Sequence, residues 1–290
     1  MSGRDLAALA CAGMLGVTAG CASRTRRVAV PAPLPARHAS LAQLVALYNR
    51  QASAVRTIAA AVRMEAETGS AFSGVIKEYR EIGGFIVAAQ PHSIRVVGQA
   101  PVVGSDLFDM VSDGKTFRMY IPSKKRFLVG PASLEQVGKK PLENLRPEPL
   151  LQALLWPEIP SGAPVVVEQE IEQNPPERDY VLTVMSGEGE SLAVERRVWF
   201  DRADLRVTRI EIFGPSGRLE SDIRYADWTA EPGEPAFPRE VRLSRPREDY
   251  NLRIRINRLT LNQPVPASRF ELAQPAGTTL VRVPAAGGNP

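Results

Sequence analysis

The sequence predicts a mainly β protein in which one long antiparallel sheet curls on itself. Roughly ten or more segments alternate apolar and polar residues, which is the period of a strand with one buried face. These segments follow one another at roughly 10–15-residue spacing, with hairpin-turn signals between them. The 22 glycines and 25 prolines among 290 residues are too many for a helix bundle and too few for a disordered chain.

The rarest residues exclude several classes of site. The only cysteines are Cys11 and Cys21, so the body of the fold contains no disulfide framework, cysteine zinc site, iron–sulfur site or CxxC pair. The only histidines are His38 and His92, which argues against a multi-histidine metal centre. The net charge is +4, and charges of both signs are interspersed along the chain. We therefore expect no cofactor, no metal and no nucleic-acid partner.

Residues 1–20 have the pattern of a secretory signal peptide that is removed. The apolar run Leu6–Val17 is shorter than the roughly 20 residues that a bilayer-spanning helix needs. Small residues follow it and lead to Cys21, as at a cleavage site. A buried N-terminal helix is the alternative interpretation.

Ala19-Gly20-Cys21 resembles a bacterial lipobox, although Thr18 stands where leucine is usual. The resemblance implies that the Cys21 thiol carries a diacylglyceryl group, with fatty acyl chains such as palmitate, as the first residue of a mature lipoprotein. Ala22 after the cysteine favours the periplasmic face of the outer membrane. Residues 21–39 then form a lipidated tether, because alternating prolines in this stretch favour an extended polyproline conformation.

A single domain is expected over residues 40–290. Ser40 and Gln43 form a capping box, and apolar residues at helical spacing follow from Leu41 to about Val55. Strand-like segments come next, and Asp113-Gly114 marks a hairpin between two of them. The alternation of the last long strand slips after Ile256, which predicts a β-bulge.

One helical insert is expected between Leu134 and Trp156. Pro147 and Pro149 open its apolar helix and Pro157 ends it. This helix can cover the apolar face of the sheet as a lid, through Leu150, Leu151, Leu154, Leu155 and Trp156.

No constellation with catalytic spacing occurs, and close carboxylates fall in turns, so we expect a protein that is not an enzyme. The remaining feature is the apolar face, which either leaves a cavity for an acyl chain or is filled as an ordinary core. Methionines on this face would adapt to an irregular ligand. The predicted cavity residues are Met64, Phe85, Val87, Phe108, Met110, Phe117, Met119, Ile121, Leu252, Ile254 and Ile256.

Three segments resemble the LolA/LolB family of periplasmic lipoprotein carriers and acceptors. The hairpin Val111–Phe117, with Tyr120 and Pro122 after it, resembles the family's V-S-D-G-x-x-x-x-x-Y-x-P motif. The closing segment resembles the family's last strand and P-x-G ending, through Phe270-Glu271-Leu272, Gln274-Pro275-Ala276-Gly277 and Val281. Pro101–Ser105 is similar to the protruding apolar loop of the membrane-anchored branch.

The resemblance implies an unclosed antiparallel β-barrel of about eleven strands with a helical lid and an N-terminal amphipathic helix. It also implies a monomer that receives lipoprotein acyl chains or phospholipid, with a periplasmic carrier protein as a candidate partner. Val102 and Val103 would contact the membrane. Gln90 stands where the soluble carriers have an arginine, so their polar lid contact is not carried over. The alternative is a structural or sensor lipoprotein that uses the same fold to bind a protein.

Overall fold

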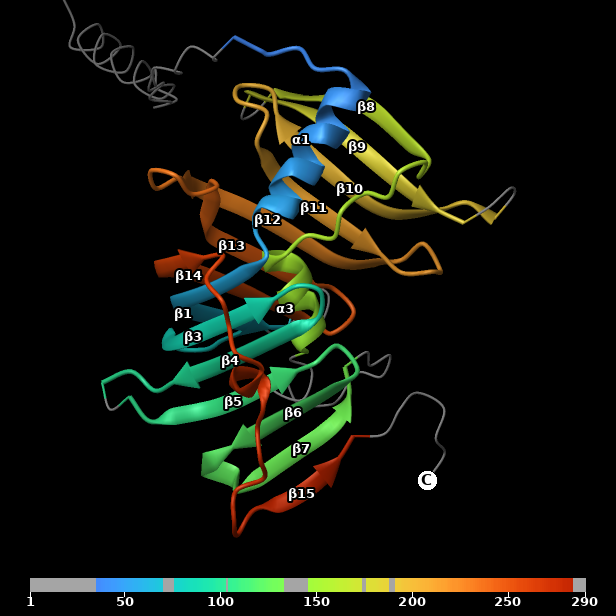
Figure 1. The fold of residues 1–290 in the computed structure, drawn as a ribbon. Coiled ribbons are helices and arrows are strands. Elements are labelled where there is room, and N and C mark those ends of the chain that lie inside the picture. Colours follow the sequence, from blue (N-terminus) through green and yellow to red (C-terminus); the bar gives the residue numbers. More distant parts are fainter. Residues whose placement is uncertain are drawn as a thin grey trace, which may run out of the picture. The chain divides into compact units, whose positions relative to one another are not determined.

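The computed structural model describes residues 35–69, 76–102, 104–132, 146–173, 176–187 and 191–283. Within these residues a single sheet of fifteen strands runs from edge to edge without closing, and two α-helices accompany it (Figure 1). The expected mainly β, unclosed fold is confirmed. The expected count of about eleven strands is too low, partly because β2 and β15 are too short to show an alternation.

The first half of the sheet follows the first helix. Its elements are α1 (Leu41–Ala54), β1 (Thr57–Thr68), β2 (Lys77–Glu78), β3 (Ile82–Ala89), β4 (Ser93–Gln99), β5 (Asp106–Ser112), β6 (Thr116–Ile121), the 3-10 turn η1 (Pro122–Lys124) and β7 (Arg126–Pro131).

The second half follows the helix α3 (Pro147–Leu154). Its elements are β8 (Val165–Gln173), β9 (Pro176–Ser186), β10 (Ala193–Asp201), β11 (Val207–Phe213), β12 (Leu219–Thr229), β13 (Phe237–Arg245), β14 (Tyr250–Leu261), the 3-10 turn η3 (Ala267–Phe270) and β15 (Thr279–Arg282).

The two halves join where β1 pairs with β14. The strand order is β15-β7-β6-β5-β4-β3-β1-β14-β13-β12-β11-β10-β9-β8, and β2 pairs with the end of β1. All pairings are antiparallel except that of β15 with β7, which is parallel. The predicted bulge is confirmed: Ala61 pairs with Arg258 and Val62 with Ile256, which leaves Asn257 as the extra residue.

Helix α1 begins at the predicted capping box and lies across the second half of the sheet (Figure 1). Gln43 N donates to Ser40 Oγ at 3.3 Å, and Ser40 N donates to Gln43 Oε1 at 2.8 Å. The buried residues Leu44, Tyr48 and Ala52 repeat every four positions, so the helix turns one stripe to the sheet.

Gln90 secures the other end of α1. Its Nε2 donates to the carbonyls of Ala52 and Val55, at 3.1 and 3.2 Å. These are carbonyls at the end of a helix, which lack partners within the helix. In this chain Gln90 therefore ties α1 to the end of β3.

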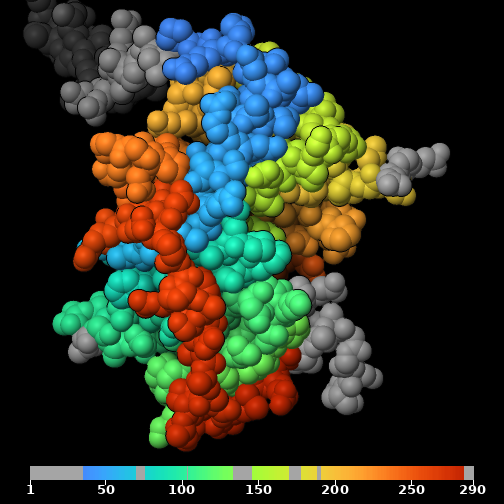
Figure 2. Space-filling view, viewed as in Figure 1, coloured from blue at the N-terminus to red at the C-terminus, as the bar shows by residue number. Residues whose placement is uncertain are grey.

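The C-terminal segment crosses the first half of the sheet on the way to β15. Figure 2 shows it, in red, lying over the strands of that half. Arg95, which points outward from β4, donates through Nη1 to the carbonyl of Arg269 in η3 at 3.2 Å. Gly277 turns the chain with a φ of 73°, a region that glycine adopts readily, and β15 then adds to the edge at β7.

The phase of β3 differs from the prediction. Phe85 was expected to face the cavity together with Val87, but the Phe85 side chain is 50% exposed and Val87 lies on the same outward face. Ile86 and Gly84 face inward instead, because they pair with Ala60 and Val62. The run is apolar at nearly every position, so alternation alone does not set its phase.

Candidate ligand cavity

A cavity of about 300 Å³ lies under the inner face of the sheet where the two halves join. Its wall is mostly apolar and comes from six strands, one 3-10 turn, one helix and a connecting loop. The lining residues are Met64, Ala66, Thr68, Tyr79, Arg80, Ile82, Val96, Leu107, Phe108, Ile121, Ser123, Lys124, Leu150, Tyr250 and Leu252. The volume is at the lower end of the range of roughly 300–1,000 Å³ that ligand pockets occupy.

The pairing of β1 with β14 places the central part of this wall. Ala66 is opposite Leu252, and Thr68 is opposite Tyr250. Directly opposed residues of antiparallel strands share one face, so all four side chains turn to the same side. Ala66 and Thr68 are small, which leaves room that larger side chains would fill. Leu150 of α3, 1% exposed, covers this space from the other side.

The mouth of the cavity combines apolar and cationic side chains. Tyr79 and Leu107 are 45% and 37% exposed, which is unusual for residues of their size. Arg80, Ser123 and Lys124 complete the rim and are exposed to solvent. The rim is therefore open, and an apolar ligand that enters there passes two positive charges.

Tyr250 is the most buried polar residue of the wall. The residue is 6% exposed, and its hydroxyl has no hydrogen-bond partner among the residues that the structure describes. Burial raises the pKa of this phenol to about 12, so it stays protonated at every physiological pH.

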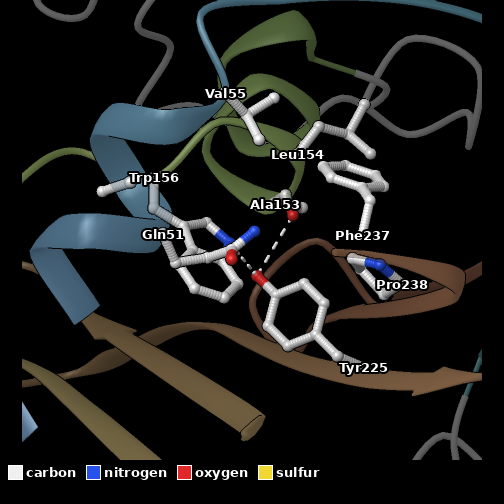
Figure 3. A pocket seen from close by; sticks show the side chains of 9 residues that line it. Gln51, Val55, Ala153, Leu154, Trp156, Tyr225, Phe237 and Pro238 are labelled. Atoms are coloured by element: carbon white, nitrogen blue, oxygen red, sulfur yellow. Dashed lines mark hydrogen bonds between the residues drawn. The ribbon is translucent and has the colours of Figure 1, made fainter. Parts of the chain in front are cut away.

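A second, much smaller pocket lies on the other half of the inner face (Figure 3). The pocket between α1, α3 and β12 has a volume of only about 10 Å³, which is about the space of one water molecule. Trp156 is part of its wall: Nε1 donates to Tyr225 Oη at 2.9 Å, and Tyr225 Oη donates to the carbonyl of Ala153 at 3.1 Å. Burial raises the pKa of Tyr225 well above its usual value.

Hydrogen bonds from α1 and from the sheet hold the segment that follows α3. Arg196 Nη1 donates to Tyr48 Oη and to the carbonyl of Pro157, both at 2.9 Å. Asn49 makes two hydrogen bonds to Ile159. Its Oδ1 accepts from the N–H of Ile159 at 2.8 Å, and its Nδ2 donates to the carbonyl of Ile159 at 3.0 Å. Helix α3 is therefore held firmly at its C-terminal end, while its first turn, with Leu150, covers the cavity.

Comparisons with known proteins return similar folds. No family model matches the chain, and no curated protein matches it in sequence. A DUF1329 family protein from Desulfovibrio piger has a TM-score of 0.51 at 15% identity, over 78% of this chain and 94% of that one. This similarity shows a shared fold.

Two further structures belong to proteins named for the LolA superfamily or for lipoprotein sorting. The LolA superfamily protein from Nitrosomonas europaea has a TM-score of 0.48 at 14% identity, over 79% of this chain and 97% of that one. The outer membrane lipoprotein-sorting domain from Vibrio parahaemolyticus has a TM-score of 0.48 at 12% identity, over 80% of this chain and 97% of that one.

The architecture is the one that the resemblance of the sequence to the LolA/LolB family implied. An unclosed sheet has one face covered by an N-terminal helix and by a helix inserted between its halves, as the sequence motifs predicted. At these identities the similarity concerns the fold alone.

The structure divides the predicted site residues into two groups. Met64, Phe108, Ile121 and Leu252 line the cavity, together with the lid residue Leu150. The rest of the inward set is packed in the buried core and does not line the cavity: Met110, Phe117, Met119, Ile254 and Ile256, and the lid residues Leu151, Leu154, Leu155 and Trp156.

Several lining residues were missed by the sequence prediction. Val96 and Tyr250 are in phase with strand positions that were recognised, so a longer reading of the same alternation would have found them. Arg80 and Lys124 lie in connections between strands, where no periodicity marks them. Their place at the mouth follows from the tertiary fold.

The two other predicted sites are the membrane-contact loop and the lipidation site. Val102 is fully exposed at the tip between β4 and β5, so it does not fold back onto the sheet. Val103 and Cys21 lie outside the described residues. Among the described residues, no helix is both long and apolar enough to cross a membrane.

Proposed function

We propose that the protein binds acyl chains of lipoproteins or other lipids in its cavity and acts in lipoprotein localisation or lipid transfer. The observation that supports this most is the apolar cavity of about 300 Å³ beneath an open, partly apolar rim. An exposed tyrosine and leucine at the rim, with Met64 and Phe108 deeper in, match the surface of a hydrocarbon chain. The LolA/LolB-like fold supports the same class of ligand.

The proposed role is that of a carrier or acceptor and not of an enzyme. General acid–base chemistry needs a titratable group within reach of the reacting atoms. Among the described residues, the cavity is lined by no carboxylate and no histidine, and its titratable side chains are Tyr79, Arg80, Lys124 and Tyr250. Binding and release of a chain require only burial of apolar surface.

The proposed location follows from the N-terminal motif. Residues 1–20 would be removed, Cys21 would carry the acyl groups, residues 21–39 would be the tether and residues 40–290 the domain. A lipoprotein anchor inserts several chains, and stable anchoring takes at least two such signals. We place the domain, as a monomer, at the periplasmic face of the outer membrane, where it would accept cargo from a periplasmic carrier.

The structural or sensor alternative predicts a filled inner face. The half of the sheet under α1 fits that description, with space for about one water molecule. The half that contains Met64 and Leu252 does not, because it retains the large cavity. The open half therefore favours a ligand-binding role.

The test is the lipid content of the protein without its anchor. Cys21→Ser removes the thiol that would be acylated, so we expect the variant to be unlipidated, either in the soluble envelope fraction or uncleaved in the inner membrane, while the wild type sediments with outer membranes. Lipids extracted from the purified variant are then analysed by mass spectrometry. Recovery of acyl lipids at a stoichiometric level is expected. A variant that carries no lipid and binds no fluorescent fatty acid would contradict the proposal.

Val102 is expected to help orient the mouth toward a membrane. Its φ of 76° is a conformation that strains β-branched residues and that glycine or asparagine adopts more readily. A valine there is thus not required for folding. Burying one valine contributes at most about 1.5 kcal/mol, roughly tenfold in partition.

Val102→Glu is therefore expected to weaken liposome binding by the Cys21→Ser chain several-fold, with stability unchanged within about 0.5 kcal/mol. Liposome co-sedimentation measures the first effect and urea denaturation the second. Val166→Glu is the matched control, because Val166 is 50% exposed on β8, at the opposite edge of the sheet. Equal effects of the two substitutions would show that the loop has no special contact.

A further inference from the structure

We propose that the cavity selects an anionic single-chain amphiphile, a fatty acid or a lysophospholipid, whose carboxylate or phosphate is held by Arg80 and Lys124. This inference rests on the proposed function and specifies its ligand. The chain would lie along Met64, Leu252 and Phe108 under Leu150 of α3. The head group would stay at the rim.

The size of the cavity limits the number of chains. An apolar cavity of about 150 Å³ holds one benzene ring. By that measure the present cavity, at about 300 Å³, holds on the order of a dozen carbons. That is most of one acyl chain, whereas a diacyl or triacyl lipid would leave further chains outside. A single-chain ligand fits the described space.

The charge of the side chains at the rim determines which head group the cavity prefers. Arg80 lies between β2 and β3, and Lys124 is the last residue of η1, so two separate connections bring two cations to one mouth. Among the described residues neither of them forms an ion pair, and no carboxylate lines the cavity. The rim therefore attracts an anion and repels a cation.

The outer face of the sheet shows how different this arrangement is. There Arg253 and Arg255 are paired with carboxylates: Arg253 donates to Glu240 at 2.6 Å, and Arg255 donates to Glu65 and Glu81, both at 3.1 Å. Within the described part of the chain, the two rim cations lack such partners, and they flank apolar surface. Ser123 is the neighbour of Lys124 on the rim and adds a hydroxyl that can donate to an oxyanion.

The head group would also remain partly hydrated. Arg80 and Lys124 are exposed, so neither cation is desolvated when the site is empty. An anion between them gains charge-assisted hydrogen bonds without being buried. The chain supplies most of the affinity, and the cations supply the preference among head groups.

The test measures head-group preference on the full-length Cys21→Ser chain. The fluorescent fatty acid dansyl-undecanoate is bound first and is then displaced by oleate, by oleoyl-lysophosphatidylglycerol or by oleyl alcohol. Oleate, the anionic lysolipid or both are expected to displace it at about tenfold lower concentration than the neutral alcohol. This advantage is expected to shrink as ionic strength rises, because exposed charges are screened. The anion that displaces the probe at the lower concentration shows whether the preferred head group is a fatty-acid carboxylate or a lysophospholipid phosphate.

Variants distinguish the contribution of the two cations to binding from that of the apolar cavity. The double change Arg80→Ala and Lys124→Ala is expected to weaken binding of the anionic probe, to remove the preference for anions and to leave the dissociation constant of oleyl alcohol unchanged once the weaker probe is taken into account. Arg80→Lys should retain the preference for anions. Lys115→Ala is the matched control, because Lys115 is an exposed cation at the far end of the β5–β6 hairpin, and it should behave as the parent does.

Failure of the head-group inference and failure of the proposed function give different results. If oleyl alcohol displaces the probe as well as the anions do, or if the double variant keeps the preference, the head-group inference is overturned and the proposed function stands. If the parent binds neither the probe nor any of the three competitors, the proposed function falls as well.

Discussion

Trp156→Ala is expected to lower the free energy of unfolding by about 3–5 kcal/mol, the usual cost of removing a large aromatic side chain from a core. Trp156 is 6% exposed and stacks on Tyr48 of α1, with ring centroids 5.5 Å apart. Its edge meets Tyr225 and Trp228 of β12 at 5.2 and 6.1 Å (Figure 3 shows the contact with Tyr225). One side chain thus joins the first helix, the end of α3 and the second half of the sheet.

Trp156→Phe is the matched variant, because it keeps a six-membered aromatic ring and removes the five-membered ring with its N–H donor to Tyr225. We expect it to cost about 1–2 kcal/mol, less than Trp156→Ala, from the lost hydrogen bond and the small cavity left behind. Urea denaturation followed by circular dichroism measures both variants. A loss below about 1 kcal/mol for Trp156→Ala would show that this segment does not anchor α3.

The sequence allowed prediction of the elements that have strong local signals. Helix α1 was expected from its capping box, and the bulge in β14 from a change of alternation after Ile256; both are where they were expected. The Asp113-Gly114 hairpin formed as well, and Asp113 Oδ1 accepts from the backbone N–H of Lys115 and Thr116, at 2.9 and 2.7 Å. Each of these features is decided within a few residues of chain.

Features that depend on distant partners were harder to predict. The inward face of β3 is decided by its pairing with β1, since the apolar run around Phe85 fits either phase. Whether an inward residue lines a cavity or fills a core depends on what covers it. Ile254 and Leu252 lie two positions apart on one face of β14, yet Ile254 is in the packed core and Leu252 is at the cavity. Periodicity identifies the face and carries no information about the space above it.

The difference between Ile254 and Leu252 decides which substitution is suited to block the cavity. Ile254 has no exposed surface, so a charge there would be buried in the core and would threaten folding. Leu252 borders empty space, and a larger side chain can extend into it. Leu252→Trp is therefore expected to fold with a loss of about 1–3 kcal/mol from overpacking.

The same substitution is expected to abolish chain binding. A ring that excludes about four methylenes of the ligand removes roughly 3 kcal/mol of burial, on the order of a hundredfold in affinity. Titration with dansyl-undecanoate measures this effect. Asn251→Trp is the matched control, because it adds the same ring on the same strand to an exposed position of the opposite face. If a folded Leu252→Trp protein bound the probe as Asn251→Trp does, the chain would have to bind elsewhere, and the cavity between β1, β14 and α3 would not be the ligand site.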